Sequence, residues 1–138
     1  MSFYIKGFIL TTSQVNFISA FLDKLWREAE QKMPLELSNK PGALFFCLAV
    51  DEDYQGRKIA GQLINLGLEL LREKSYFSFA MIHAFNHFTK KAAENEGFEV
   101  VHSVDAKEFH WKGFPLYSKV SEPHGCVTRM IKILKKYS

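Results

Sequence analysis

A short basic loop at residues 55–61, which contains Arg57 and Lys58, has the residue types best suited to binding an anion. An unbroken apolar run (residues 44–50) and an acidic turn (residues 51–54) precede this loop, and an apolar helical pattern follows it. This order predicts a strand buried on both faces, then a loop, then a helix. Such a loop directs free backbone N–H groups and the positive end of a helix at one point. The arrangement suits a phosphate or pyrophosphate, and the two basic side chains would add charge.

Two histidines, His83 and His87, lie near the end of the next predicted strand. Parallel sheets place functional groups at strand ends, and a histidine there can act as a base through water near neutral pH. The alternative for His83 is a hydrogen-bonded structural histidine. The four-residue spacing also suits two zinc ligands, but no third ligand follows in a recognised pattern, so we expect no metal.

The predicted elements alternate between strands and helices in the order β-α-β-α-β-α-β-β. Strands are expected over residues 3–10, 44–50, 77–82, 98–104 and 127–134. Helices are expected between the capping candidates at 11–13 and Pro34, over 59–71, and over 86–96 with Gly97 as the C-terminal cap. Helical crossovers imply a largely parallel centre, while the last two strands are expected to pair as a long-looped antiparallel hairpin. The fold class is therefore α/β with a mixed sheet.

The composition is that of one ordinary globular domain covering residues 1–138, with 47% apolar and 24% charged residues. A net charge of +3 is too small to argue for nucleic acid, and we expect Lys132, Lys135 and Lys136 to form a solvated tail. Two cysteines, Cys47 and Cys126, make no disulfide framework, which favours a reduced, cytoplasmic location. The sequence has no signal-peptide pattern and no apolar run of about 20 residues, so we expect no membrane association.

Residues 48–60 resemble the acetyl-CoA motif of the GCN5-related N-acetyltransferase (GNAT) superfamily, which reads Gln/Arg-x-x-Gly-x-Gly/Ala after a strand and an acidic turn. Gln55 matches the first position and Ala60 the last, while Lys58 replaces the middle glycine. We expect that a helix start at Lys58 does not need glycine dihedrals. The resemblance implies that the loop holds the pyrophosphate of acetyl-CoA and that backbone N–H groups of the preceding strand hold its arm. The cofactor-binding residues would then be Leu48, Ala49, Val50, Gln55, Gly56, Arg57, Lys58, Ile59, Ala60, Gly61 and Asn86. The alternative is a plain strand-to-helix turn.

Residues 84–98 resemble the third-helix signature of the same family. The resemblance implies that Asn86 hydrogen-bonds the pantetheine arm and that Thr89 lies near the thiol. The alternatives are a helix N-cap for Asn86 and a structural threonine. Ala93 occupies the place of the family's usual general acid, a tyrosine. Tyr117 is a candidate proton donor to the leaving thiolate on its side-chain chemistry alone.

The segment of residues 122–132 is similar to the end of the invertebrate arylalkylamine (dopamine-type) N-acetyltransferases. This similarity implies that His124 lies near the acceptor site, the alternative being a loop histidine. The first strand and helices of full-length family members have no counterpart here, so the fold is expected to be N-terminally shortened, and no residue inherits the catalytic glutamate of that part. A sheet without those strands exposes an edge, so a homodimer through this edge is expected.

The resulting prediction is an acetyl-CoA-dependent N-acetyltransferase that acetylates a small primary amine by direct attack in a ternary complex. The alternative is a catalytically degenerate relative that acts as a CoA-ester-binding or protein-interaction module. A different α/β nucleotide-binding domain ranks last, because the sequence has no Gly-x-Gly-x-x-Gly pattern and no P-loop.

Overall fold

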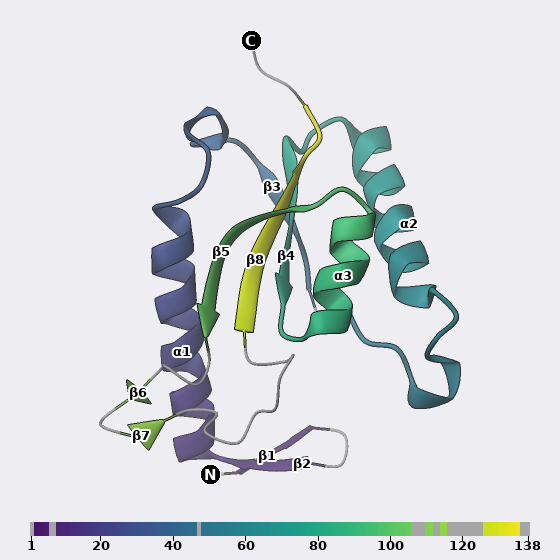
Figure 1. Ribbon diagram of the computed structural model, residues 1–138. Coiled ribbons are helices and arrows are strands. Elements are labelled where there is room, and N and C mark those ends of the chain that lie inside the picture. The colour runs from purple at the N-terminus through teal and green to yellow at the C-terminus, as the bar shows by residue number, and fades with distance from the viewer. Residues whose placement is uncertain are drawn as a thin grey trace.

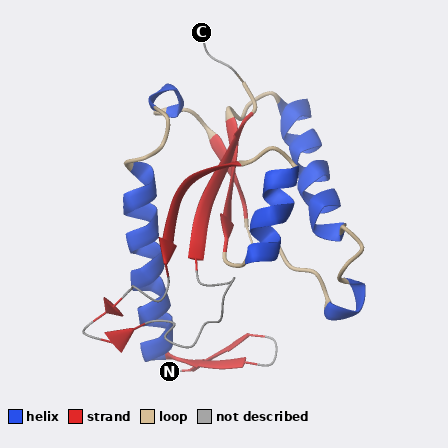
Figure 2. Cartoon of the chain, in the orientation of Figure 1, coloured by secondary structure: helices blue, strands red, loops and turns tan. Residues whose placement is uncertain are grey.

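The computed structural model describes residues 2–5, 8–46, 48–105, 110–111, 114–115 and 126–135, with the backbone alone for residues 2–18, 110–111 and 114–115. Its helices and strands are arranged around one larger sheet (Figures 1 and 2). In chain order they are β1 (Ser2–Ile5), β2 (Phe8–Thr11), α1 (Thr12–Glu30), η1 (Leu35–Leu37), β3 (Gly42–Phe45), η2 (Glu52–Tyr54), α2 (Ile59–Lys74), β4 (Phe79–Ala84), α3 (His87–Asn95), β5 (Glu99–Asp105), β6 (His110–Trp111), β7 (Phe114–Pro115) and β8 (Cys126–Ile133).

The central sheet has the strand order β3-β4-β8-β5. β3 is parallel to β4, while β8 runs antiparallel to both β4 and β5. The mixed α/β class and the antiparallel pairing of the last two long strands are confirmed. A largely parallel centre is wrong, because β8 lies between the two strands that the α3 crossover connects.

Helices cover both faces of this sheet, with α2 and α3 on one face and α1 on the other (Figure 1). The alternation of side chains along β4 divides the core accordingly. Ile82 packs with Ile64 and Leu68 of α2, whereas its neighbour Met81 packs with Leu37 against the opposite face. Side chains at successive positions of β4 therefore pack on opposite faces of the sheet.

Strand β3 is shorter than predicted, because it ends at Phe45 and residues 48–50 are not in a strand. It is also not buried on both faces: Leu44 is 38% exposed and Phe46 is 81% exposed. β3 lies at the edge of the sheet, where it pairs with β4 alone among the described residues. An edge strand can also contain an apolar run without being enclosed. The apolar pattern alone therefore did not distinguish this edge strand from the longer, buried strand that we predicted. Cys47 lies outside the described residues.

Other boundaries also differ from the sequence-based expectation. The single strand predicted over residues 3–10 is a pair of short antiparallel strands, β1 and β2. Two further short strands, β6 and β7, pair with each other between the predicted strands over residues 98–104 and 127–134, where no strand was predicted. Both pairs form between strands that are close in sequence. The apolar and turn patterns of these segments do not distinguish such a pair from a single strand or a loop.

Two lysines from the end of the sequence contact the C-terminal ends of helices. Lys132 Nζ donates to the carbonyl oxygen of Glu96, 2.7 Å away, just after α3, and Lys135 donates to the carbonyl of Ser75 just after α2. Cations at these positions interact favourably with the helix dipole and satisfy terminal carbonyls. Within the described residues, the expectation of a solvated tail is therefore wrong for Lys132 and Lys135.

Candidate functional site

The central sheet opens where β3 and β4 stop pairing. Their register ends at Phe45 and Ile82, while β4 continues to Ala84 alongside β8. Within the described part of the chain, no hydrogen bond involves the backbone of residues 48–50. Backbone donors and acceptors that the sheet would otherwise use are thus available to a ligand at this point.

A segment that contains the short helix η2 connects β3 to the start of α2. The Asp51 side chain accepts a hydrogen bond from the backbone N–H of Asp53 (3.0 Å) and so caps η2. The Arg57 guanidinium carbon lies 5.2 Å from the centre of the Tyr54 ring, within cation–π range. This contact gives the basic loop a preferred side-chain arrangement beside the acidic turn.

Lys58 adopts left-handed backbone angles, φ 59° and ψ 24°, at the residue immediately before α2. The expectation that this position does not need glycine dihedrals is therefore wrong. A side chain in the left-handed region costs about 1–2 kcal/mol relative to the ordinary helical region, and glycine avoids this cost. Gly56, two residues earlier, also has a positive φ of 77°.

A cavity of about 490 Å³ lies between this loop, residues 48–50 and the start of α3. The predicted residues that line it are Leu48, Ala49, Val50, Gln55, Gly56, Lys58, Ile59, Ala60, Asn86 and Thr89. Asn86 Oδ1 also accepts a hydrogen bond from the Thr89 N–H (2.8 Å), so the helix-cap interpretation of Asn86 is confirmed. Arg57 and Gly61 do not line this cavity.

Tyr54 and Phe88 line the same cavity, although the sequence interpretation gave neither of them a role. Tyr54 is 53% exposed and Phe88 is 73% exposed, which is unusual for large aromatic side chains. The available signal was positional, since both residues lie within the resembling segments, Tyr54 at the end of η2 and Phe88 in the first turn of α3.

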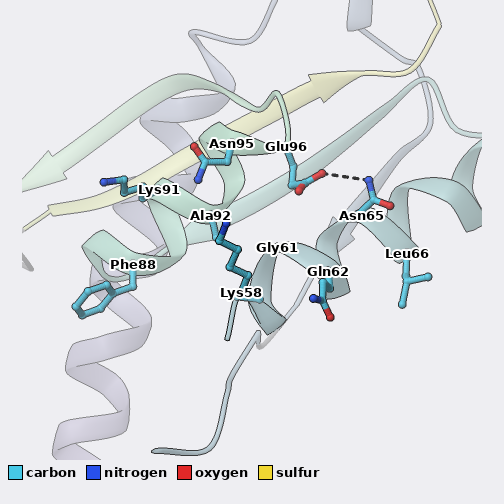
Figure 3. A pocket seen from close by; sticks show the side chains of 11 residues that line it. Lys58, Gly61, Gln62, Asn65, Leu66, Phe88, Lys91, Ala92, Asn95 and Glu96 are labelled. Atoms are coloured by element: carbon cyan, nitrogen blue, oxygen red, sulfur yellow. Dashed lines mark hydrogen bonds between the residues drawn. The ribbon is translucent and has the colours of Figure 1, made fainter. Parts of the chain in front are cut away.

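A second cavity, of about 780 Å³, lies between α2 and α3 (Figure 3). Lys58, Ala60 and Phe88 line both cavities, so the two adjoin. Its wall also includes Gly61, and Asn65 Nδ2 donates a hydrogen bond to Glu96 Oε2 across the gap (3.2 Å). Of the residues expected to hold a cofactor, Lys58, Ala60 and Gly61 therefore line this second cavity.

His83 is not among the residues that line either cavity. It accepts a hydrogen bond from Arg129 Nε (Nε2 at 3.1 Å) and packs edge-on against Trp26 of α1, with ring centres 5.3 Å apart. Burial, followed by the positive charge of Arg129, lowers the pKa of His83 to about 4. The catalytic role of His83 stays a prediction, and the observed contacts favour the structural alternative. Tyr117 and His124 lie outside the described residues.

Arg129 is fully buried beside His83, a feature that the sequence pattern of β8 did not indicate. Its Nη1 lies 2.7 Å from Glu30 Oε1, and its guanidinium carbon lies 4.8 Å from the Trp26 ring centre. Its Nη2 has no hydrogen-bond partner among the described residues. Arg129 therefore connects β8 to β4 and α1 on the face opposite α2 and α3.

Tyr54 and Lys58 are the titratable residues among those described that line the smaller cavity. Its chemistry is consequently that of binding through backbone groups, two side-chain amides and a cation, without a described carboxylate or imidazole. Among the described residues there is no group of three potential metal ligands. None of the described helices has the length and apolar character needed to cross a membrane.

No protein-family model matches the chain, and no curated protein matches it in sequence. Similar solved structures do exist. Mosquito arylalkylamine N-acetyltransferase like 5b has a TM-score of 0.68 and 22% identity, over 83% of this chain and 52% of its own. Arylalkylamine N-acetyltransferase 2 from Aedes aegypti has a TM-score of 0.65 and 21% identity, over 81% and 52%. Drosophila melanogaster polyamine N-acetyltransferase has a TM-score of 0.53 and 15% identity, over 62% and 41%.

These likenesses show that the chain has the fold of these solved N-acetyltransferases. The resemblance to the invertebrate arylalkylamine N-acetyltransferases, first seen in the sequence motifs, is confirmed in the fold. The chain spans about half the length of the solved structures that it matches.

Proposed function

We propose that the protein binds acetyl-CoA in the cavity between residues 48–60 and α3 and transfers the acetyl group to a small primary amine. One observation supports this most strongly. Residues chosen from two separate sequence motifs, Gln55 to Ala60 and Asn86 to Thr89, line one cavity. That cavity lies beside residues 48–50, whose backbone forms no hydrogen bond with another described residue.

The proposed roles follow from the chemistry of a thioester ligand. The start of α2 and the loop before it would receive the pyrophosphate, because backbone N–H groups and the Lys58 ammonium favour an anion there. The backbone of residues 48–50 would hold the pantetheine arm and polarise the thioester carbonyl. Asn86 and Thr89 lie where the arm and thiol would pass. The acetyl group would move to the amine in a ternary complex, with cleavage of the carbon–sulfur bond and protonation of the thiolate.

A binding module without efficient catalysis is the second candidate. It is favoured by the smaller cavity, in which no described carboxylate or imidazole lies ready to accept a proton from the amine. In that case the protein would bind a CoA ester, and a partner protein would use the complex. We propose a cytoplasmic location for either function, because two cysteines that make no disulfide framework favour a reduced compartment.

Reversal of the charge at the loop tests the proposed cofactor site. Lys58→Glu places a carboxylate beside the expected pyrophosphate, and we expect calorimetric titration to show acetyl-CoA binding at least about 10-fold weaker. Lys32→Glu is the matched control, because Lys32 is an exposed lysine just after α1 and lines neither cavity. Equal binding by wild type and Lys58→Glu would remove the loop from the site.

Turnover separates the two candidate functions. Wild-type protein with acetyl-CoA and a panel of arylalkylamines and polyamines should release CoA and form acetylated amine, both detectable by mass spectrometry. Binding of acetyl-CoA without any acetylated product would favour the binding module. The amine panel is chosen because the similar structures are arylalkylamine and polyamine N-acetyltransferases.

A further inference from the structure

An apolar groove of about 250 Å³ lies between the end of β3 and α2, and the proposed acetyl transfer gives it no role. None of the residues that line it has a polar side chain: they are Phe45, Phe46, Leu48, Leu63, Ile64 and Gly67. Phe46 is 81% exposed and Leu63 is 46% exposed, so large apolar side chains border the groove at the surface. Such a site favours an apolar group, because the removal of apolar surface from water is favourable.

This apolar groove adjoins the smaller cavity, since Leu48 lines both. The two differ in chemistry, because the lining of the smaller cavity includes the polar side chains of Gln55, Lys58 and Asn86, whereas the lining of the groove includes none. A ligand that occupies both would therefore have a polar part in the smaller cavity and an apolar part in the groove.

The surroundings of residues 48–50 favour one direction for an acyl chain. In the proposed binding mode the backbone of these residues polarises the thioester carbonyl, so the acyl chain begins beside Leu48. On the opposite face of the sheet, the buried side chain of Arg129 donates a hydrogen bond to His83 near the end of β4. An alkyl chain placed against such groups would deprive them of polar surroundings, which is costly, whereas the groove beyond Leu48 has only apolar side chains.

We propose that the apolar groove binds the alkyl chain of a medium-chain acyl-CoA, whose thioester lies beside residues 48–50. This inference rests on the proposed function, because it concerns the acyl group of the same kind of ligand. It goes further by naming the acyl donor. An acyl group longer than acetyl would contact Leu63 and Phe46, which line the groove but not the smaller cavity. Each methylene group that leaves water for the groove would add to the affinity.

Calorimetric titration of the full chain with acetyl-CoA and with octanoyl-CoA, which differ only in the length of the acyl chain, tests the proposal. Wild-type protein should bind octanoyl-CoA at least about 10-fold more tightly. The heat-capacity change on binding should also be more negative for octanoyl-CoA, because a negative change is the signature of apolar surface that becomes buried.

A substitution in the wall of the groove tests its location. Leu63→Gln places a polar amide there and keeps a good helix former on α2. We expect it to weaken octanoyl-CoA binding about 5-fold and to leave acetyl-CoA binding unchanged. Leu70→Gln is the matched control, because Leu70 is 58% exposed on the same helix and lines neither the groove nor the two cavities. It should change neither affinity.

The outcomes separate this inference from the proposed function. Equal affinities of the wild type for acetyl-CoA and octanoyl-CoA would overturn the inference while leaving the cofactor site intact. An equal loss of both affinities in Leu63→Gln would also overturn it, because Leu63 would then act on a part that the two ligands share. A changed molar mass of Leu63→Gln in light scattering, with both affinities unchanged, would overturn it in favour of a contact between two copies of the chain. Absence of binding by either ligand would overturn the proposed function together with the inference.

Discussion

The fully buried guanidinium of Arg129 depends on a partner that is itself half-exposed. Glu30, at the end of α1, lies 2.7 Å from Arg129 Nη1, while Nη2 has no hydrogen-bond partner in the part of the chain that the structure describes. Removing the carboxylate would leave a buried charge poorly compensated, and such a loss is far more costly than the loss of a surface ion pair. The stability of this face therefore depends on one side chain of α1.

We expect Glu30→Gln to lower the free energy of unfolding by about 1–3 kcal/mol, as measured by chemical denaturation. The loss should be smaller than the largest losses known for buried ion pairs, because Glu30 is accessible to water. In an Arg129→Met background the same Glu30→Gln change should have almost no effect, since no buried charge remains. Equal destabilisation in both backgrounds would contradict the pairing.

The lowered pKa of His83 predicts how the stability of the protein depends on pH. Its pKa is lowered to about 4 by burial and then by Arg129, from an ordinary value of 6.5. The unfolded chain therefore binds this proton more readily than the folded chain. The contribution of neutral His83 to the free energy of unfolding is therefore complete above pH 6.5 and is lost as the pH falls toward 4. Thermal melts between pH 7.5 and pH 4.5 should show a steeper decline for wild type than for His83→Gln. Parallel declines would contradict this assignment.

At the scale of elements, β3 and α2 meet through a glycine. A Cβ built on Gly67 would lie 2.8 Å from Cζ of Phe45, so the absence of a side chain on α2 lets the ring of β3 pack closely. Phe45 in turn lies edge-on to Phe98, with ring centres 6.0 Å apart. This contact positions the last residue of β3, after which the chain leaves the sheet to form the cavity wall.

Gly67→Ala should destabilise the protein by about 1–2 kcal/mol, although alanine is the better helix former by up to about 1 kcal/mol. The added methyl group would collide with Phe45. Phe45→Leu in the same chain should recover part of the loss, because the smaller side chain can move aside. The midpoint of denaturant unfolding measures both. A stabilising effect of Gly67→Ala alone would show that Phe45 adapts without cost.

The sequence predicted the elements best where the signals are local. Helix α3 begins beside Asn86 and closes at Gly97, whose φ is 88°, because capping and the left-handed C-terminal residue depend on near neighbours. The end of β3 was not predictable in the same way, because its exposure depends on its place at the sheet edge. The candidate site shows the same difference. The sequence motifs identified residues that line one cavity, but they did not predict the backbone angles of Lys58, which depend on the turn that begins at Tyr54.

At the scale of the whole molecule, the outer edge of β3 remains without a partner strand among the described residues. β3 has neither a charged residue nor a proline, the usual features that prevent edge strands from pairing with another chain. The expectation of a homodimer through this edge therefore stays open as a prediction for the protein in solution.

We expect light scattering coupled to size-exclusion chromatography to give a dimer mass for the wild type. Leu44→Lys, which adds a charge to the edge strand, should give a monomer mass. Leu35→Lys is the matched control, because Leu35 is highly exposed on η1 and outside the sheet. A monomer mass for the wild type at every concentration would contradict the expectation.

The position of β8 also affects how the protein can be made. β8 is the last of the described strands in the sequence, yet it lies between β4 and β5 and pairs with both. During synthesis, β4 and β5 leave the ribosome before the strand that joins them, so the nascent sheet cannot close until residues 126–133 have emerged. Until then the apolar face of β4 has no complete core to enter, and contacts so distant in sequence are slow to form. Protection from aggregation at this stage would have to come from chaperones or from rapid completion of the chain.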